Sequence, residues 1–221
     1  MTRPEPSLIV CFAVEAEAAP FRRVCRAVPQ LRILRTGMGR QNAARTLRAA
    51  LPSTGAALVV TSGFAGGLNP GLPGGTVVFE ADPVPGLEAC LLATGAQAAR
   101  FHTLDRVLTT ATEKRVVREA TGADAVEMES EPIRRLCHER QVPSATIRVI
   151  SDGATDDLPL DFNRLLTPAH TINYTRLALA LALQPAKLLA LLRFQQSLKG
   201  AAVRLARVLE RVTQLVIRDP R

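Results

Sequence analysis

Short apolar runs alternate in this chain with segments of helical character, and this alternation limits the possible folds more than any other feature of the sequence. Residues 8–14 and 58–61 are apolar runs of strand length, and residues 31–36 are a third strand candidate, which a helical pattern over residues 41–51 follows. Parallel strands need long crossover connections, which are usually helices. The sequence therefore predicts βα units around a largely parallel sheet.

Further candidates continue this pattern. Residues 75–80 and 145–150 have strand character, and residues 112–119 have helical character. Residues 63–68 read Gly-Phe-Ala-Gly-Gly-Leu, which is the richest concentration of glycine in the chain. Glycine lets backbone amides approach a ligand closely, so we expect a glycine-rich loop here that lines a binding site.

The length of 221 residues and a hydrophobic content of 47% suit one α/β domain. We expect a catalytic domain over residues 1–184 and a basic amphipathic helical tail over residues 185–221. The apolar run 8–14 is too short to cross a bilayer and is followed at once by Glu15 and Glu17, so it is interpreted as a first strand and not a signal peptide. The expected location is cytoplasmic.

The net charge of +8 is concentrated at the C-terminal end, where residues 176–221 contain nine basic and two acidic residues. With aromatic residues at only 4%, the rest of the chain has little material for base stacking, so nucleic acid is not expected as a partner. An apolar stripe runs through the tail at helical spacing. Its members are Leu188, Leu191, Phe194, Leu198, Ala202, Leu205, Leu209, Val212 and Val216.

Two carboxylates stand directly after apolar stretches. Glu129 begins a predicted helix that has Pro132 in its first turn, where a helix needs no backbone donor. Asp152 follows the β-branched run of residues 145–150. Ligands of open α/β sheets bind outside the carboxyl ends of the strands. We therefore expect both acids at one site for a small ligand.

Four sequence blocks stand in order between residues 8 and 162. They are Phe12-Ala13-Val14-Glu15-Ala16-Glu17, Thr36-Gly37-Met38-Gly39, the glycine-rich residues 61–68, and Val126-Glu127-Met128-Glu129 with Ile150-Ser151-Asp152. In this order and spacing they resemble the nucleoside phosphorylase and nucleosidase superfamily, most closely the branch that contains methylthioadenosine/S-adenosylhomocysteine nucleosidases. The resemblance implies a three-layer α/β/α sandwich around a twisted, mixed and mostly parallel sheet, assembled as a homodimer or larger homo-oligomer.

The resemblance also implies roles for the two acids. Asp152 is expected to protonate a purine base at N7 as the N-glycosidic bond breaks, with Ser151 orienting it and burial favouring the acid form. The alternative for Asp152 is a turn residue that accepts hydrogen bonds from nearby amides. Glu129 is expected to bind the ribose 2′ and 3′ hydroxyls, because a carboxylate can accept two hydrogen bonds from a vicinal diol. Its alternative is a carboxylate that stabilises a helix N-terminus.

Other site residues follow from the same resemblance. Glu17 is expected to activate the attacking water, with a solvated helical glutamate as the alternative. Met128 is expected to pack under the sugar, although a plain core methionine fits the same pattern. Gly63 and Phe64 are expected to line the pocket of the nucleophile. Glu127 receives no role. The family's aromatic residue for base stacking has no counterpart between residues 105 and 114.

The nucleophile is the main open alternative. A carboxylate beside a phosphate dianion costs binding energy, and Phe64 stands where phosphorolytic relatives often have a serine, so water is favoured. Arg40 and Arg148 are candidate anion contacts, which keeps phosphate-dependent phosphorolysis as the alternative. The expected function is a nucleosidase that releases adenine from a 5′-substituted adenine nucleoside. The chemistry needs no metal or organic cofactor, and the four cysteines and three histidines are scattered.

The tail resembles that of nucleosidase-like proteins associated with hopanoid lipid synthesis, for which the expected substrate is adenosine joined to a triterpenoid. A basic helix with an apolar stripe can lie on anionic lipid, which predicts peripheral contact with the inner face of a membrane. Packing of the same stripe on the body of the protein or on a second subunit is favoured over this lipid contact. A third alternative is a catalytically idle protein whose tail binds a membrane surface or a partner.

Overall fold

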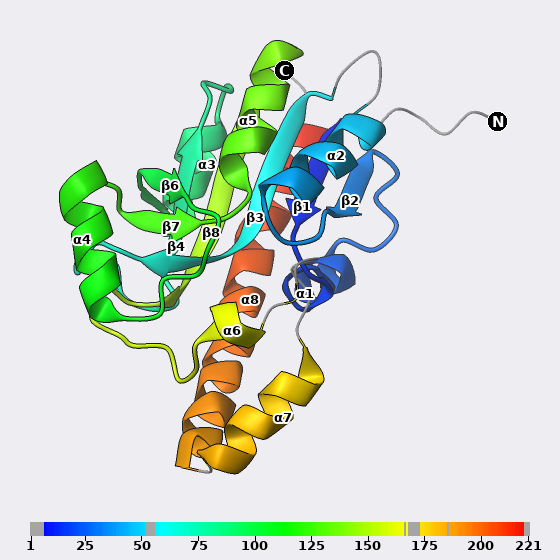
Figure 1. Cartoon of the computed structure of the whole chain (residues 1–221). Helices are drawn as coiled ribbons and strands as arrows, with labels where there is room; N and C mark the ends of the chain where they lie inside the picture. The colour runs from blue at the N-terminus through cyan, green and yellow to red at the C-terminus, as the bar shows by residue number, and fades with distance from the viewer. Residues whose placement is uncertain (1–6, 52–55, 166, 168–172, 185, 219–221) are drawn as a thin grey trace.

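The computed structural model describes residues 7–51, 56–165, 167, 173–184 and 186–218. Its centre is a mixed, mostly parallel sheet with helices on both faces (Figure 1). The main strand order is β2-β1-β3-β8-β4-β5, while β7 pairs with both β3 and β6. The strands are β1 (Leu8–Phe12), β2 (Leu31–Arg35), β3 (Leu58–Gly67), β4 (Val77–Ala81), β5 (Gln97–Ala98), β6 (Phe101–Thr103), β7 (Ala125–Glu127) and β8 (Ser144–Asp152).

The helices form the two outer layers. They are α1 (Glu15–Val24), α2 (Arg40–Ala50), α3 (Leu87–Ala93), α4 (Ala111–Thr121), α5 (Ser130–Glu139), α6 (Phe162–Leu165), α7 (Tyr174–Leu183) and α8 (Ala186–Arg218). Alternate side chains of β1 enter two different cores: Leu8, Val10 and Phe12 pack with α1 and α8, whereas Ile9 and Cys11 pack with α2 and α5. A strand that is buried on both faces needs apolar residues throughout, which explains the continuous apolar run. The expected three-layer α/β/α fold with a C-terminal helix is confirmed.

The glycine-rich stretch differs from expectation. Residues 63–67 are not a loop, because β3 continues through them and pairs in parallel with β8 and antiparallel with β7. The register shifts between Ala65 and Gly66, where the strand contains a bulge. Glycine in a strand commonly marks a bulge or a close approach by another group. The expectation of a loop was wrong because the strands that pair with this segment lie far away in sequence.

The second half of α8 is part of the main core. Leu205, Leu209 and Val212 are buried in the same cluster as β1, β3 and β8. The first half extends past the sheet beside α7 (Figure 1), and its Leu191 packs against Leu160 and Leu165. The apolar stripe predicted from sequence therefore packs on the body in this second half. The boundary at Pro185 lies outside the described residues, and the division into two parts stays a prediction.

Within the described part of the chain, every helix is too short or too polar to cross a bilayer.

Truncation of Leu205 tests whether α8 stabilises the body. Leu205 is 1% exposed, so Leu205→Ala is expected to lower the free energy of unfolding by about 2–5 kcal/mol through lost burial and a cavity. Val203→Ala on the same helix is the control, because Val203 is 44% exposed and its truncation should cost less than about 0.5 kcal/mol. Urea unfolding followed by circular dichroism measures both. Equal losses for the two variants would contradict the described packing of α8.

Candidate active site

A cluster of one arginine and three glutamates lies beside the middle of β3. Glu17 comes from α1, Glu127 from the end of β7, Glu129 from the N-cap position of α5, and Arg148 from β8. All four side chains are more than nine-tenths buried. Residues from four separate elements therefore meet at one point, which we call the Arg148 cluster.

Arg148 is the only cation within this cluster of described side chains. Its guanidinium lies 2.7 Å from the Glu127 carboxylate and 3.3 Å from the Glu129 carboxylate. It also donates to the Thr61 hydroxyl at 3.1 Å. A buried charge without a partner costs several kcal/mol, so these carboxylates and this guanidinium depend on one another.

Glu127 is held by donors of the protein on both carboxylate oxygens. It accepts hydrogen bonds from the amides of Glu129 and Ser130, at 2.8 and 2.7 Å, and from the hydroxyls of Thr103 and Ser130. These contacts and Arg148 fill its lone pairs. Glu127 therefore fixes the turn between β7 and α5. No role was predicted for it, because two of its partners, Thr103 and Arg148, lie 24 and 21 residues away along the chain.

Glu17 lies against the backbone of β3. Its carboxylate accepts hydrogen bonds from the amides of Ala13, Val14 and Phe64, at 3.1, 3.2 and 2.9 Å. A Cβ atom on Gly63 would lie 2.5 Å from Glu17 Oε1, so only glycine leaves room for this carboxylate. Burial raises the pKa of Glu17 above its usual range, although Arg148 and the three amides oppose the shift. Glu17 is thus a buried carboxyl group with raised basicity.

Glu129 stands at the start of α5, as the sequence predicted. It accepts a hydrogen bond from the amide of Gly39 at 2.8 Å in addition to its contact with Arg148. Burial raises the pKa of Glu129 to about 7, and Glu127 and Glu17 add to the shift, while Arg148 and the Gly39 amide oppose it. Glu129 therefore changes charge near neutral pH.

Asp152 ends β8 and lies next to Gly66 of β3, where an added Cβ would be 3.6 Å from Asp152 Oδ2. The Ser151 hydroxyl contacts Asp152 Oδ1 and lies 3.1 Å from the carbonyl oxygen of Ala65. On its other oxygen, Asp152 forms an ion pair of 2.5 Å with Lys114 of α4. Lysines are usually exposed, so the sequence offered no sign of this partner.

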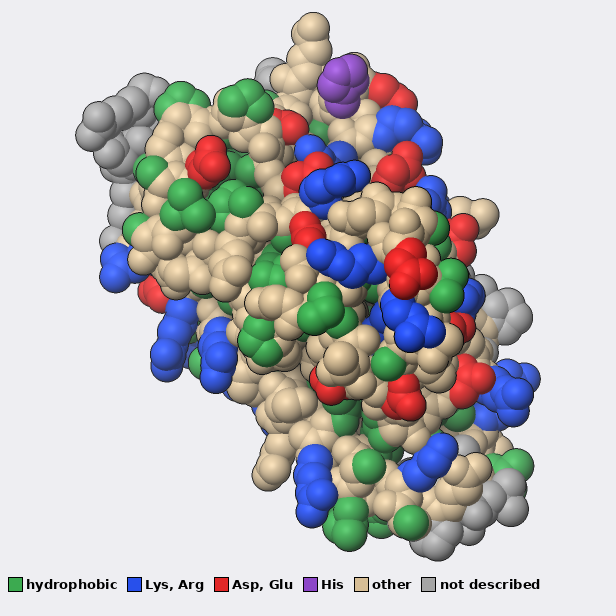
Figure 2. Space-filling view, turned by 90° about the vertical axis from the view of Figure 1, so that its left-hand side faces the viewer, with side chains coloured by type: hydrophobic (Ala, Val, Ile, Leu, Met, Phe, Trp, Pro, Cys, Tyr) green, Lys and Arg blue, Asp and Glu red, His purple; other side chains and the backbone are tan. Residues whose placement is uncertain are grey.

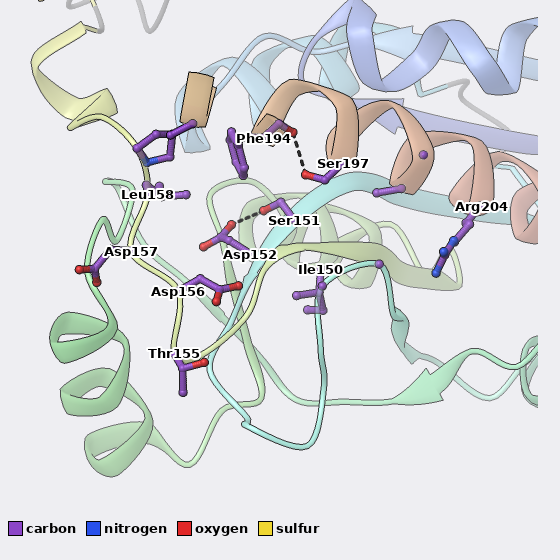
Figure 3. Close-up of a pocket in the computed structure, with 16 residues that line it drawn as sticks. Ile150, Ser151, Asp152, Thr155, Asp156, Asp157, Leu158, Phe194, Ser197 and Arg204 are labelled. Atoms are coloured by element: carbon purple, nitrogen blue, oxygen red, sulfur yellow. Dashed lines mark hydrogen bonds between the residues drawn. The ribbon is translucent and has the colours of Figure 1, made fainter. Parts of the chain in front are cut away.

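A cavity of about 730 Å³ opens beside Asp152 (Figure 3). Ser151 and Asp152 lie on one side of it, and Phe194 and Ser197 of α8 lie on another (Figure 3). Phe194 packs at 6.2 Å, between ring centroids, against Phe162. The lining of this cavity contains neither Glu17 nor Glu129. Both lie beside an earlier part of β3, near Gly63. An aromatic side chain of α8, Phe194, thus lines the cavity beside Asp152.

The remaining predicted residues lie in the same region. Met128 is buried between Glu127 and Glu129 in the turn before α5, and Gly63 and Phe64 belong to β3 beside Glu17. Arg40, a candidate anion contact, is already paired with Asp105 at 3.1 Å and Glu131 at 2.8 Å. Among the described residues, no group of three or more His, Cys, Asp or Glu could hold a metal ion.

The raised pKa of Glu129 predicts how stability depends on pH. The folded protein binds this proton up to about pH 7 while the unfolded chain releases it near pH 4.5, so the Glu129 contribution to the free energy of unfolding falls as pH rises through this window. Glu129→Gln lacks the titration and should gain stability relative to wild type between pH 4.5 and 7, as measured by urea unfolding at several pH values.

Glu139→Gln is the matched control, because Glu139 is exposed at the other end of α5. Its stability should follow the wild-type pH profile. The assignment to Glu129 is wrong if Glu129→Gln and wild type also show parallel profiles.

Comparisons with known proteins agree with this architecture. The structure is similar to a methylthioadenosine/S-adenosylhomocysteine nucleosidase of Helicobacter pylori, with a TM-score of 0.69, 16% identity, and coverage of 96% of this chain and 100% of that chain. The native futalosine hydrolase of Helicobacter pylori gives a TM-score of 0.69 at 15% identity, with coverage of 96% and 99%. The corresponding methylthioadenosine/S-adenosylhomocysteine nucleosidase of Neisseria meningitidis gives 0.68 at 19% identity, with coverage of 94% and 98%.

No curated protein matches the sequence. The family model of the phosphorylase superfamily, in contrast, matches residues 27–82 and 91–183. This match spans well over half of the chain and includes Glu129, Arg148 and Asp152. The protein therefore belongs to the phosphorylase superfamily.

Proposed function

We propose that this protein is a purine nucleosidase that hydrolyses the N-glycosidic bond of a 5′-substituted adenine nucleoside and releases adenine. The observation that carries the proposal is the placement of three buried carboxylates along β3. Glu17 lies against Gly63, Glu129 belongs to the same Arg148 cluster, and Asp152 lies beside Gly66. Membership of the phosphorylase superfamily and the resemblance of the fold to nucleosidases support it.

The spacing of these acids suits a nucleoside. Gly66 is three positions after Gly63, which corresponds to roughly 10 Å along a strand. This is the scale of a nucleoside measured from the sugar to the far edge of the base. A ligand that lies along β3 can therefore place its ribose near Glu129 and its base near Asp152.

Each acid has a chemical task in this arrangement. Glu129 accepts hydrogen bonds from the ribose hydroxyls and stabilises the positive charge that develops on the sugar. Glu17 takes a proton from the attacking water, which needs a base at neutral pH. Asp152 protonates the departing base at N7. Phe194 offers a ring on which the base can stack in the cavity beside Asp152.

The charges of the site favour water over phosphate as the nucleophile. Arg148 is fully buried, and Glu17, Glu127 and Glu129 face it. Arg40 is paired with Asp105 and Glu131. A phosphate dianion here would meet more carboxylates than free cations, and the repulsion would oppose its binding. Phosphorolysis to ribose 1-phosphate stays the alternative.

Adenine release in the absence of phosphate tests this function. Wild-type protein is expected to release adenine from methylthioadenosine or an analogue with a longer 5′ alkyl group at a rate that added phosphate does not change. Asp152→Asn should lower kcat by about 100-fold or more, because the variant cannot donate a proton from a carboxyl group. Chromatography of free adenine measures both.

Asp161→Asn is the control for this experiment, since Asp161 is an exposed carboxylate whose partner is Arg164 at 3.1 Å. It should keep wild-type turnover. Adenine release that stops without phosphate would refute hydrolysis, and full activity of Asp152→Asn would refute the assigned acid.

A second proposal concerns the end of the molecule formed by α7 and the first half of α8. Residues 174–202 contain four basic residues and no acidic residue. Four leucines of this end are exposed, namely Leu179, Leu188, Leu189 and Leu192. The lower end of the molecule shows hydrophobic and basic side chains and no acidic side chain in Figure 2. A surface of this composition suits peripheral contact with anionic lipid.

Membrane contact would bring the site close to a substrate whose 5′ group is a lipid, such as an adenosylhopane-like molecule. The cavity beside Asp152 supports this, because its wall includes Ala190 and Phe194 from the same half of α8. The exposed leucines of this face could also form the interface of a homodimer or larger assembly. The uniform positive charge of the face favours anionic lipid, because two copies would repel each other.

Vesicle sedimentation tests the lipid contact. The double variant Leu189→Ser and Leu192→Ser is expected to weaken binding to phosphatidylglycerol vesicles by about tenfold, because two exposed apolar side chains are lost from the lipid-facing surface. Val116→Ser is the control, since Val116 is an exposed apolar residue on α4. Equal binding of the double variant and wild type would contradict the proposed contact.

A further inference from the structure

Lys114 is a buried charged residue that the proposed roles have not used. Its side chain is 0% exposed. Its ammonium group lies 2.5 Å from Asp152 Oδ2 and donates to the carbonyl oxygens of Gly153 and Asp156, at 2.8 and 2.7 Å. A lysine ammonium has three N–H donors, and these contacts use all three. Lys114 is therefore fixed in one orientation toward the proposed acid.

The surrounding structure holds this lysine firmly. Thr110 caps the start of α4 and forms a reciprocal capping box with Glu113, one residue before Lys114. The amide of Ala111 donates to Asp157 Oδ1 at 2.7 Å, which joins the start of α4 to the loop after β8. The helix that carries Lys114 and the loop that follows Asp152 are thus held together. Burial of an ammonium is costly, and a surface helix such as α4 does not require it for packing.

The Ser151 hydroxyl lies between two oxygen atoms, and its contacts are compatible with Asp152 either with or without a proton. Ser151 Oγ contacts both the Ala65 carbonyl oxygen and Asp152 Oδ1. A hydroxyl has one proton to donate, and a carbonyl oxygen can only accept. When that proton points to Ala65, the contact with Asp152 requires a proton on the carboxyl group. When it points to Asp152, the carboxylate is satisfied without one.

We propose that Lys114 is a positioning residue that holds Asp152 Oδ2 and supplies, through Asp152, the proton that the departing base receives. The inference rests on the proposed nucleosidase function and deepens it. Lys114 donates to Oδ2, and the proton that Asp152 passes to the base comes from this ammonium group. The pair acts as one donor with one shared proton.

The proton balance closes over one turnover. The N9–C1′ bond breaks with its electron pair on the base, and an N7–H bond forms with the proton of Asp152. Because that proton comes from the Lys114 ammonium group, its transfer leaves Asp152 as a carboxylate and Lys114 as a neutral amine. The water oxygen bonds to C1′ and its proton passes to Glu17. Glu17 releases a proton to solvent and Lys114 takes one up as the products leave.

The pH profile of kcat for Lys114→Met tests this inference. In wild type the proton for the base comes from Lys114, whereas in the variant Asp152 must take it from solvent, where protons become scarcer as pH rises. The variant is therefore expected to lose about 100-fold in kcat at pH 8 and to recover to within about threefold of wild type at pH 5. Adenine release between pH 5 and 9 measures this shift of the alkaline limb.

Two further variants complete the design. Arg115→Met is the matched control, because Arg115 follows on the same helix, has a side chain that is 70% exposed, and should show the wild-type profile. Lys114→Gln retains amide donors for the Gly153 and Asp156 carbonyl oxygens, so it reports on the ammonium group if Lys114→Met does not fold. It should show the same shift of the alkaline limb.

The outcomes are distinct. Recovery of either Lys114 variant at acid pH supports the inference. A loss that is equal at every pH shows a merely structural lysine and overturns it, as does an unchanged profile. A wild-type protein that releases no adenine refutes the proposed function and this inference together, whereas an active wild type with parallel profiles refutes only the inference.

Discussion

The attraction between Arg148 and the glutamates around it is the interaction on which the site depends. Burial of three carboxyl groups beside one strand would be strongly unfavourable without a cation, because each charge loses its hydration. Arg148 faces all three, and it reaches them because β8 lies next to β3 at the centre of the sheet. The remaining excess of acid over base explains why burial leaves the pKa values of Glu17 and Glu129 raised.

The glycines of β3 make the same arrangement possible from the side of the backbone. Gly63 has a φ of 140° and leaves the space that the Glu17 carboxylate occupies, while Gly66 lies between Val126 of β7 and Asp152. Side chains at these two positions would push the acids away from the strand. Glycine in a strand lacks a packing side chain and has low β-propensity, but it leaves room for the carboxylates at the site. The glycine-rich pattern thus indicates side chains that approach β3 closely, and it does not indicate a loop.

The sequence predicted what depends on local patterns. The strand at residues 8–14 follows from an apolar run, and the placement of Glu129 at a helix start follows from the segment after it. Features that depend on distant partners could not be predicted in this way. Nothing near Lys114 marks it as buried, because its contacts come from the loop after β8, about 40 residues later in the chain. The ion pair of Glu127 could not be predicted for the same reason, since Arg148 is 21 residues away.

The central claim is that one purine riboside lies along β3, with its ribose at Glu129 and its base at Asp152. A crystal structure of the protein with a non-hydrolysable 5′-alkylthio adenosine analogue tests it most directly. The account predicts that the Glu129 carboxylate binds both ribose hydroxyls and that the Asp152 carboxyl group lies within hydrogen-bond distance of the atom equivalent to N7. A complex in which the ribose hydroxyls bind elsewhere and Asp152 contacts no atom of the base would contradict it.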